Sequence, residues 1–419
     1  MNILLVSANT ERINMPTMPL GLGLVAASTR RAGHRVHFLD LMFQPDPLLA
    51  LRDAIGSSAP EVIGISVRNI DDQNRQAPRF LLEQVRPIVD ECRRRSGARV
   101  VLGGAGFSMF PVSALALLGA DYGIQGPGEI PFARLLEHLE RGQDPSPIAG
   151  VVAAGRGSGI APSFDEDLAA LPLADDELWA SADPTSPELW VPIEARRGCP
   201  NRCAYCATAQ IQGKTIRTRA PRAVVECMGR LAAAGFRQQY FVDNSFNIPE
   251  SYALELCHAI QAADLGVRWR CILYPHRVSE QLVSAMAAAG CVEVSVGFES
   301  GSDPILRVLN KHFRAEDVRR LVAMLARYRI RRVGFLLFGA PGETRETVEE
   351  SLAFAESLDL DALRTTVGIR VYPNTPLAET AREQGIISRD DDLLRPTFYL
   401  APGLEPWIHE RVQAGYRRA

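Results

Sequence analysis

Three closely spaced cysteines limit the folds open to this chain more than any other feature of its sequence. Residues 198–206 read Gly-Cys-Pro-Asn-Arg-Cys-Ala-Tyr-Cys, with thiols at Cys199, Cys203 and Cys206. Thiolates are soft ligands that suit zinc or iron–sulfur clusters, and this spacing lets them surround one inorganic centre. A closed zinc site or an ordinary four-iron cluster takes four protein ligands, but the next cysteine is Cys227. We therefore expect three protein ligands and one metal position open to another molecule.

The cysteines are expected on a loop that follows a strand. Residues 189–195 are apolar and predict a buried strand, and the polar residues 207–218 predict a loop. Parallel α/β folds bind ligands at the carboxyl ends of their strands. Two other interpretations are bound zinc and cysteines that only pack in the core. Core packing is what we expect of the remaining cysteines, which are Cys92, Cys227, Cys257, Cys271 and Cys291.

The cysteine spacing, with Tyr205 directly before the third cysteine, resembles the cluster loop of radical S-adenosyl-L-methionine (SAM) enzymes. The resemblance implies that the three thiolates hold a [4Fe-4S] cluster whose fourth iron binds the amino and carboxylate groups of SAM. It also implies an electron donor such as flavodoxin or ferredoxin.

Length and charge further limit the class of protein to which this chain can belong. A chain of 419 residues is too long for one ordinary core and predicts two domains. Its 46 basic and 49 acidic residues form no basic block, so we expect no nucleic-acid partner. We also expect no membrane span, because no apolar run is long enough, and a cytoplasmic location, because the cysteines are grouped for a metal centre.

Residues 1–145 alternate between predicted strands and helices, as in a doubly wound, Rossmann-like parallel sheet. The strands are expected at residues 2–7, 35–40, 62–67, 99–103 and 121–125, and the clearest helices at 20–32 and 80–95. A ligand of such a sheet lies over the carboxyl ends of the strands. The segments expected there are residues 7–19, 68–74, 103–110 and 126–129.

Three interpretations of this domain remain open. A nicotinamide dinucleotide would require G-x-G-x-x-G after the first strand, and residues 8–12 do not supply it, although Asp40 would suit a ribose. A scaffold without a ligand is the second, since a fold alone does not establish a ligand. The third rests on a resemblance to the cobalamin-binding domain that is fused to many radical SAM enzymes. It is carried by residues 16–22, 32–34, 64–66, 103–104 and 126–129.

This resemblance implies a set of cobalamin-binding residues. They are Ser7, Pro19, Ser66, Arg68, Asn69, Gly103, Gly104, Gly126 and Glu129. His34 and His37 lie outside the D-x-H-x-x-G pattern in which a histidine coordinates cobalt, which implies a cobalt with no imidazole below it. Arg68 and Asn69 are then expected under the corrin, with capping of the loop as the alternative.

A linker and a second α/β domain follow. Residues 146–188 are rich in Gly, Pro and acidic residues and predict the linker. Strands are then expected at residues 189–195, 239–243, 268–273, 292–299, 332–338 and 362–371, and helices at 221–234, 280–289, 315–328 and 344–358. Six such units predict a partial, TIM-like (β/α)6 barrel over residues 189–385. Residues 386–419 are expected to form a tail whose aromatic residues either close the barrel mouth or cover its outside.

Segments at the predicted strand ends resemble SAM-binding motifs of the same superfamily. The residues concerned are Tyr205, Asp243, Asn244, Glu299, Ser300, Gly339, Pro341 and Tyr372. In the superfamily these positions meet the amino group, the ribose and the adenine of SAM. Arg270 and Lys311 are expected as partners of carboxylates, with surface charge as the alternative. Each motif alone also fits a structural role, such as a turn at residues 339–342 or a helix start at Glu343.

Together these resemblances cover nearly the whole chain and imply a cobalamin-dependent radical SAM methyltransferase. A 5′-deoxyadenosyl radical from SAM and a methyl group carried by cobalamin would together methylate an unactivated carbon of a small metabolite or lipid precursor. One alternative is a radical SAM enzyme that catalyses a cyclisation, ring contraction or other rearrangement. The other is a non-enzymatic cobalamin- or metal-binding protein. The sequence identifies no catalytic residue and no substrate.

Overall fold

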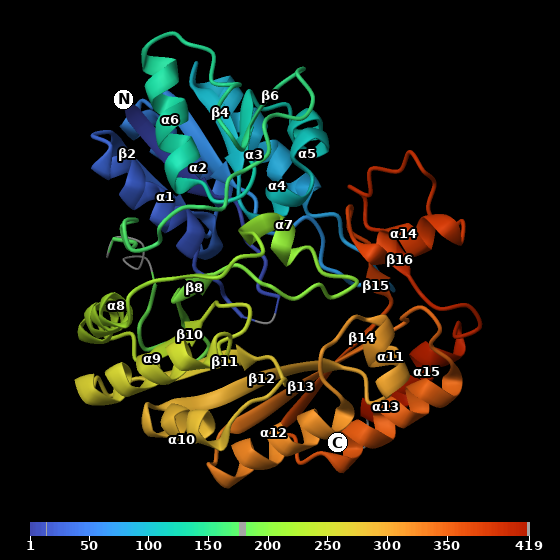
Figure 1. Cartoon of the computed structure of the whole chain (residues 1–419). Coiled ribbons are helices and arrows are strands. Elements are labelled where there is room, and N and C mark those ends of the chain that lie inside the picture. Colours follow the sequence, from blue (N-terminus) through green and yellow to red (C-terminus); the bar gives the residue numbers. More distant parts are fainter. Residues whose placement is uncertain (14, 176–181, 417–419) are drawn as a thin grey trace. The chain divides into compact units, whose positions relative to one another are not determined.

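The computed structural model describes residues 1–13, 15–175 and 182–416, with side chains up to residue 413 (Figure 1). Residues 176–181 of the expected linker, Asn14 at the predicted ligand edge and residues 417–419 of the tail lie outside the described residues. The chain divides into two compact units. The first comprises Met1–Asp72, Arg79–Pro192 and Gln210–Thr218, and the second comprises Gln73–Pro78, Ile193–Ala209 and the chain from Arg219 onward. The domain boundaries at residues 145, 188 and 385 stay a prediction.

The first unit contains a six-stranded sheet with the order β2-β1-β3-β4-β5-β6. Its strands are β1 (Asn2–Ser7), β2 (Arg35–Asp40), β3 (Val62–Ser66), β4 (Arg99–Gly103), β5 (Tyr122–Ile124) and β6 (Val151–Ala153). Strands β1 to β5 pair in parallel, which confirms the five predicted strands to within a residue at each end. The antiparallel edge strand β6 lies in the segment that we assigned to the linker. Three residues are too few to show a strand pattern in the sequence.

Helices cover this sheet on both faces, as a doubly wound fold requires (Figure 1). They are α1 (Leu20–Arg31), η1 (Leu41–Phe43), α2 (Pro47–Ser58), α3 (Leu82–Arg95), α4 (Ala105–Met109), α5 (Pro111–Leu118) and α6 (Glu129–Glu140). Helix α1 packs beside α6, and α2 packs beside α3. On one face, Leu22 of α1 and Phe132 of α6 join Ile3, Val62 and Val101 of the strands in one buried apolar cluster.

The second unit contains a six-stranded sheet with the order β14-β13-β12-β11-β10-β7. Its strands are β7 (Val191–Ile193), β10 (Gln238–Phe241), β11 (Arg268–Leu273), β12 (Cys291–Glu299), β13 (Arg331–Phe338) and β14 (Ala362–Val367). Between them come α8 (Pro221–Ala233), α9 (Glu250–Ala263), α10 (Glu280–Ala288), α11 (Asp303–Val308), α12 (Ala315–Arg327) and α13 (Arg345–Ser357). Because the strand order follows the chain and β7 and β14 are its two edges, the sheet is an open (β/α)6 barrel, as predicted.

Several short elements differ from the sequence predictions. The segment predicted as a loop over residues 207–218 contains α7 (Thr208–Gln212) and β9 (Arg217–Thr218), and β8 (Arg196–Arg197) precedes the cysteines. The last predicted strand is interrupted at Gly368, so that β14 is followed by a separate β15 (Ile369–Arg370). Gly368 has φ +85°, and a Cβ there would lie 2.2 Å from the side chain of Arg75. Only glycine fits this position without movement of a neighbour.

The tail is more ordered than the sequence indicated. After α14 (Pro376–Glu383), strand β16 (Phe398–Tyr399) pairs with β15, and helix α15 (Trp407–Tyr416) follows. The amide of Ala401 donates to the carbonyl of Gly339, just after β13. Arg411 of α15 forms an ion pair with Glu349 of α13. The tail therefore contacts the chain just after β13 and also the outer helix α13. Closure of the barrel mouth by its aromatic residues stays a prediction.

Burial agrees with the roles expected of the other cysteines. Cys92, Cys257, Cys271 and Cys291 are buried, and Cys227 is half-buried.

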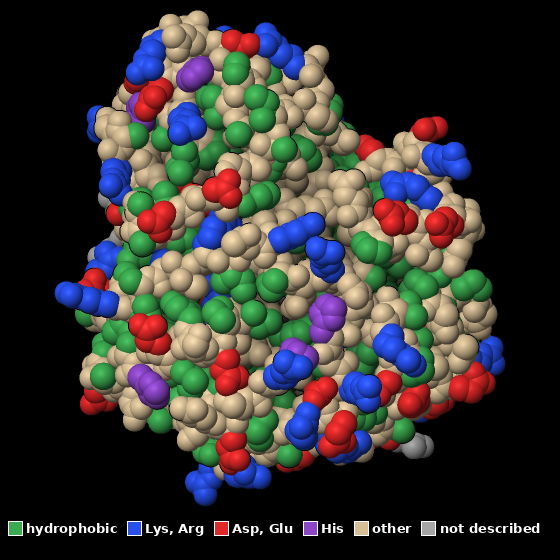
Figure 2. Space-filling model, in the orientation of Figure 1, with side chains coloured by type: hydrophobic (Ala, Val, Ile, Leu, Met, Phe, Trp, Pro, Cys, Tyr) green, Lys and Arg blue, Asp and Glu red, His purple; other side chains and the backbone are tan. Residues whose placement is uncertain are grey.

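No helix within the described part of the chain is long and apolar enough to cross a membrane. On the face shown in Figure 2, basic and acidic side chains are interspersed.

Candidate cofactor sites

The three cysteines lie on one loop between β8 and α7, and backbone hydrogen bonds fix the loop at several points. The amide of Ala204 donates to the carbonyl of Leu309 at 3.0 Å, and the carbonyl of Ala204 accepts from Leu377 at 3.0 Å. The side-chain amide of Asn310 donates to the carbonyl of Arg202 at 2.6 Å. The loop conformation is therefore set by contacts between and beside the cysteines.

All three thiols of the loop are free, with Cys199 and Cys203 half-buried and Cys206 exposed. Burial raises the pKa of the Cys199 and Cys203 thiols, and the positive charge of Lys311 opposes that rise. Among the described residues, no three Cys, His, Asp or Glu side chains converge as ligands of a single metal ion would. A [4Fe-4S] cluster has a different requirement, since each thiolate bonds a different iron atom. Three free thiols beside a buried cation suit such a cluster.

A partly buried trio of polar side chains forms beside the cysteines. The hydroxyl of Tyr205 donates to the carboxylate of Glu299 at 2.9 Å. The ammonium of Lys311 donates to the Tyr205 hydroxyl at 3.0 Å and to the same Glu299 oxygen at 3.2 Å. Glu299 ends β12 in the left-handed region, with φ +65°, where the register with β13 shifts. Burial raises the pKa of the Tyr205 hydroxyl well above its usual value, so this group stays protonated.

Asp243 lies at the carboxyl end of β10, as predicted, but its carboxylate faces other protein groups. It accepts from the amides of Ala195 and Arg196 at 3.0 and 3.2 Å and pairs with the Arg196 guanidinium at 3.2 Å. Both side chains of the pair are almost completely buried. Burial raises the pKa of Asp243 to about 6. The pair thus holds the chain that enters the cluster loop, and the carboxylate is already engaged within the protein.

Other predicted SAM positions also have structural partners. The hydroxyl of Ser300 is buried, where it contacts the hydroxyl of Ser351 at 2.9 Å and accepts from the amide of Ser302. The hydroxyl of Tyr372 accepts from the side chain of Gln73 at 3.0 Å. Asn244, Pro341 and Tyr372 are half-buried after the ends of the strands. Contacts of all these positions with SAM stay a prediction.

Gly339 begins the turn after β13 with φ +109°. The carboxylate of Glu343 accepts from the amide of Gly339 and, at 3.1 Å, from that of Ala340. Its second oxygen is buried without a hydrogen-bond partner. Burial raises the pKa of Glu343 to about 7. The sequence offered a helix start as the structural alternative for Glu343, whereas the structure shows that its carboxylate closes the turn.

The two basic residues expected to meet carboxylates both do so within the protein. Arg270 pairs with Glu293 at 3.3 Å, and burial lowers the pKa of its guanidinium. Lys311 pairs with Glu299 at 3.2 Å, with 5% of its side chain exposed. The Arg270 side chain is half-buried, so of the two only Lys311 has a buried side chain.

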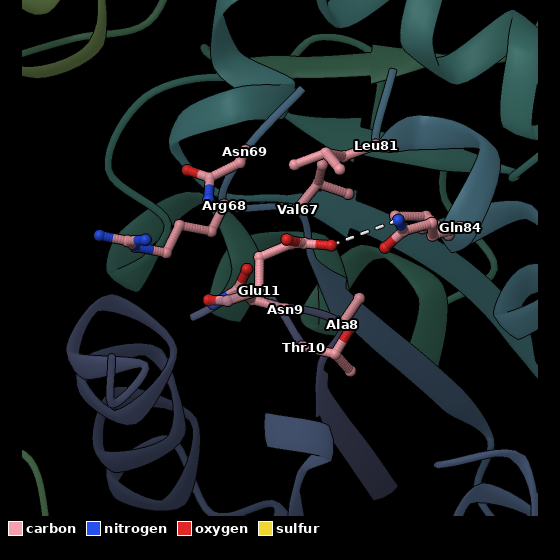
Figure 3. Close-up of a pocket in the computed structure, with 10 residues that line it drawn as sticks. Ala8, Asn9, Thr10, Glu11, Val67, Arg68, Asn69, Leu81 and Gln84 are labelled. Carbon is pink, nitrogen blue, oxygen red and sulfur yellow. Dashed lines mark hydrogen bonds between the residues drawn. The ribbon is translucent and has the colours of Figure 1, made fainter. Parts of the chain in front are cut away.

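The predicted cobalamin edge forms in the first unit. Ser7, Ser66 and Gly103 lie side by side on β1, β3 and β4. A pocket opens beyond β1 and β3, where the strand order reverses, and this is where doubly wound sheets bind ligands. Figure 3 shows Arg68 and Asn69 at this pocket. The complete lining is Ala8, Asn9, Thr10, Glu11, Val67, Arg68, Asn69, Leu81, Gln84 and Val85.

Sequence reasoning missed a hydrogen-bonded group in this pocket. The Glu11 carboxylate accepts from Arg79 at 2.7 and 3.2 Å and from Gln84 at 3.3 Å, the last drawn in Figure 3. Arg79 also pairs with Asp72. These residues come from the loop after β1, the loop after β3 and helix α3, so no local sequence pattern identifies them. The group fixes the loop that follows β1.

The other predicted cobalamin residues frame this edge. Gly104 has φ +96°, and a Cβ there would lie 2.6 Å from the carbonyl oxygen of Val67. Gly126 has φ +83°, and its amide donates to the hydroxyl of Ser108. Pro19 precedes α1, and Glu129 is buried at the start of α6. Their contacts with cobalamin stay a prediction.

Asp40 gives no support to a dinucleotide site. Its carboxylate accepts from the amide of Met42 at 3.2 Å and so caps η1. Burial raises its pKa to about 6. Only 5% of the residue is exposed, so the carboxylate is covered by protein.

Comparison with known proteins agrees with both domains. Residues 6–136 match the family model for the B12 binding domain, and residues 193–355 match the model for the radical SAM superfamily. Tryptophan 2-C-methyltransferase of Streptomyces laurentii is 26% identical over 445 residues, covering 90% of this chain and 74% of the relative. Cytidylyl-2-hydroxyethylphosphonate methyltransferase of Streptomyces wedmorensis is 23% identical, covering 97% and 86%.

A solved structure is similar over nearly the whole chain. It is the radical SAM methyltransferase TsrM of Kitasatospora setae with tryptophan and a SAM analogue bound. The TM-score is 0.86 at 25% identity, covering 99% of this chain and 88% of TsrM. A second TsrM structure, at 26% identity, contains cobalamin and a [4Fe-4S] cluster. This chain therefore joins a B12-binding domain to a radical SAM domain and belongs to the cobalamin-binding radical SAM enzymes.

Proposed function

We propose that this enzyme transfers a methyl group from SAM to a carbon atom of a small molecule. The observation that carries the proposal is the similarity to TsrM over 99% of the chain, with both cofactor-binding parts present in one polypeptide. The two methyltransferases named above act on different small molecules. Their chemistry therefore supports methyl transfer and leaves the substrate of this chain open.

The residues of the second unit have separate tasks in this proposal. Cys199, Cys203 and Cys206 would hold the [4Fe-4S] cluster. When bound, the cluster and cobalamin supply one-electron and methyl-transfer chemistry that amino-acid side chains cannot supply. Tyr205 of the cluster loop donates a hydrogen bond to Glu299. Glu299 is also the group predicted to bind the SAM ribose. The turn from Gly339 to Glu343 would present its backbone to the adenine.

In the first unit, the edge made by Ser7, Ser66 and Gly103 would carry the corrin, with Arg68 and Asn69 facing it from the pocket. The orientation of Asn9 and Glu11 is held by a hydrogen bond of 3.5 Å and by the ion pair with Arg79. The loop after β1 is therefore ordered before a ligand binds, which reduces the conformational entropy that is lost on binding.

The proposal includes three further expectations. A flavodoxin or ferredoxin supplies the electron, and the enzyme has no nucleic-acid partner, which agrees with the interspersed charges in Figure 2. We also propose a cytoplasmic location, because the cysteines are free and [4Fe-4S] centres suit a reducing compartment.

An isotope experiment tests the function. The enzyme, loaded anaerobically with iron, sulfide and cobalamin, is incubated with a small-molecule cell extract and with either normal or trideuteriomethyl SAM. We expect a metabolite that gains the label on carbon, detected by mass spectrometry. Formation of 5′-deoxyadenosine together with a rearranged, unlabelled metabolite would contradict methyl transfer and support the rearrangement.

A further inference from the structure

The segment Leu309, Asn310 and Lys311 contacts the cluster loop at three successive places. Leu309 accepts from the amide of Ala204, Asn310 donates to the carbonyl of Arg202, and Lys311 donates to the hydroxyl of Tyr205. These contacts fall between the three cysteines, so the loop cannot shift without breaking one of them. Asn310 has φ +56°, a left-handed conformation that asparagine tolerates better than most residues.

This segment also brings a full positive charge into the interior. The Lys311 side chain is only 5% exposed, and its one carboxylate neighbour with a described ion pair is Glu299 at 3.2 Å. The rings of Tyr205, Tyr274 and Phe313 lie 5.2, 6.0 and 6.0 Å from its ammonium. Aromatic faces attract a cation, and in such a low-dielectric environment a charge acts on its neighbours far more strongly than in water.

We propose that Lys311 is a positioning residue for the cluster and raises its reduction potential by acting as an internal counter-charge. Three thiolates outweigh the charge of the oxidised iron–sulfur core, so reduction adds an electron to a centre that is already negative. A fixed cation nearby stabilises the reduced form more than the oxidised form, and local charge is one of the factors that set such potentials. One electron enters the cluster in this step, and no bond is formed or broken.

The geometry separates this role from that of a simple structural salt bridge. Glu299 shares its charge between Tyr205 and Lys311, and both the lysine and the glutamate act on Cys203. The two charges act in opposite directions, so their removal must move the potential in opposite directions. Removal of a residue that only holds the loop together would not shift the reduction potential in a direction set by the charge of that residue. The inference rests on cluster binding as proposed above and extends it to the electron-transfer step.

The test is a redox titration of the reconstituted enzyme without SAM, followed by electron paramagnetic resonance. We compare wild type with Lys311→Met, Lys311→Arg, Glu299→Gln and Arg411→Met, after iron and sulfide analysis of each. Arg411 forms an ion pair with Glu349 between α13 and α15, outside the cluster loop and the segment Leu309–Lys311. It controls for the loss of a positive charge as such.

We expect a lower midpoint potential in Lys311→Met, a higher one in Glu299→Gln and nearly unchanged values in Lys311→Arg and Arg411→Met. Cleavage of SAM by Lys311→Met should fall several-fold with reduced flavodoxin and recover with titanium(III) citrate. A wild-type potential in Lys311→Met overturns the proposal. If that variant assembles no cluster, an unchanged or lower potential in Glu299→Gln overturns it instead. Failure of methyl transfer in the wild type leaves these potentials measurable, so the two proposals fail separately.

Discussion

At the scale of single residues, the cluster loop depends on groups that the sequence places far from it. Tyr205 is in the cysteine motif, but Glu299 and Lys311, which meet its hydroxyl, are contributed by the end of β12 and the chain after α11. The cysteine spacing predicts the ligands because each thiolate must reach its own iron atom from one short loop. Nothing local predicts the partners, since their contact requires the strand order of the barrel.

Substitution of one loop cysteine should remove the cluster and leave the fold. We expect Cys203→Ala to lose the iron content and the visible absorbance of the reconstituted protein, because two thiolates cannot replace three. The matched control is Cys257→Ala, which removes a buried thiol from the core of the same unit. Iron analysis and absorbance spectroscopy measure both. A fully loaded Cys203→Ala protein would refute the assignment of the loop.

Glu343 should make stability depend on pH. Its folded pKa of about 7 lies above the ordinary value of 4.5, so protonation favours the folded state. The stability that Glu343 contributes is fully present below the pKa of its carboxyl group in the unfolded state. It is lost as pH rises through the pKa of the same group in the folded state. From about pH 6 to about pH 8 this loss amounts to about 1 kcal/mol.

Thermal unfolding of wild type and Glu343→Gln over this pH range measures the effect. We expect the variant to lose less stability than the wild type as pH rises, because the amide does not titrate. Glu346→Gln is the control, since Glu346 is an exposed carboxylate three residues further on, in the first turn of α13, and its pKa is lowered instead of raised. Parallel pH profiles for wild type and Glu343→Gln would show that this carboxylate does not titrate in the range.

At the scale of elements, the long strands and helices could be predicted, whereas most strands of two or three residues could not. Strands β1, β2, β4 and β11 have the predicted limits, because four or more consecutive apolar or alternating residues show a clear period. Strands β6, β8, β9 and β16 are two or three residues long and exist only through tertiary pairing. For the same reason, sequence reasoning found Asp243 at a strand end but not its partner Arg196, which is fixed by the packing of β7 beside β10.

The Asp243–Arg196 pair should matter for stability. We expect Asp243→Asn to destabilise the protein by about 3 kcal/mol, because it leaves the buried Arg196 guanidinium without its counter-charge. Arg222→Gln is the control, since it breaks an exposed pair with Glu226 that should contribute little. Chemical denaturation followed by circular dichroism measures both. A stable Asp243→Asn protein with weakened SAM binding would favour direct contact with SAM instead.

At the scale of the whole molecule, the order of the two strand–helix alternations predicted both folds, and the sheet edge at which each ligand binds stays a prediction. The pocket beyond β1 and β3 lies where the strand order reverses, which follows from the topology alone. The contribution of Glu11, Arg79 and Gln84 could not be predicted, because two loops and helix α3 meet there.

Removal of Arg68 should weaken cobalamin binding without unfolding the protein. The side chain is exposed at the pocket and has no described ion pair, so few protein contacts are lost. We expect a several-fold higher dissociation constant for Arg68→Ala in an absorbance titration with cobalamin. Arg141→Ala, an exposed arginine after α6, should bind like the wild type. Equal affinity of both variants would show that the corrin lies elsewhere.

The most direct test of the account measures the products of SAM in one anaerobic reaction. The reconstituted enzyme is supplied with SAM and a strong reductant, with and without cobalamin, and S-adenosylhomocysteine and 5′-deoxyadenosine are quantified together. The account predicts that both products form when cobalamin is bound and that S-adenosylhomocysteine is lost when it is omitted. If the protein supplied with cobalamin binds none and forms 5′-deoxyadenosine without S-adenosylhomocysteine, the account is contradicted.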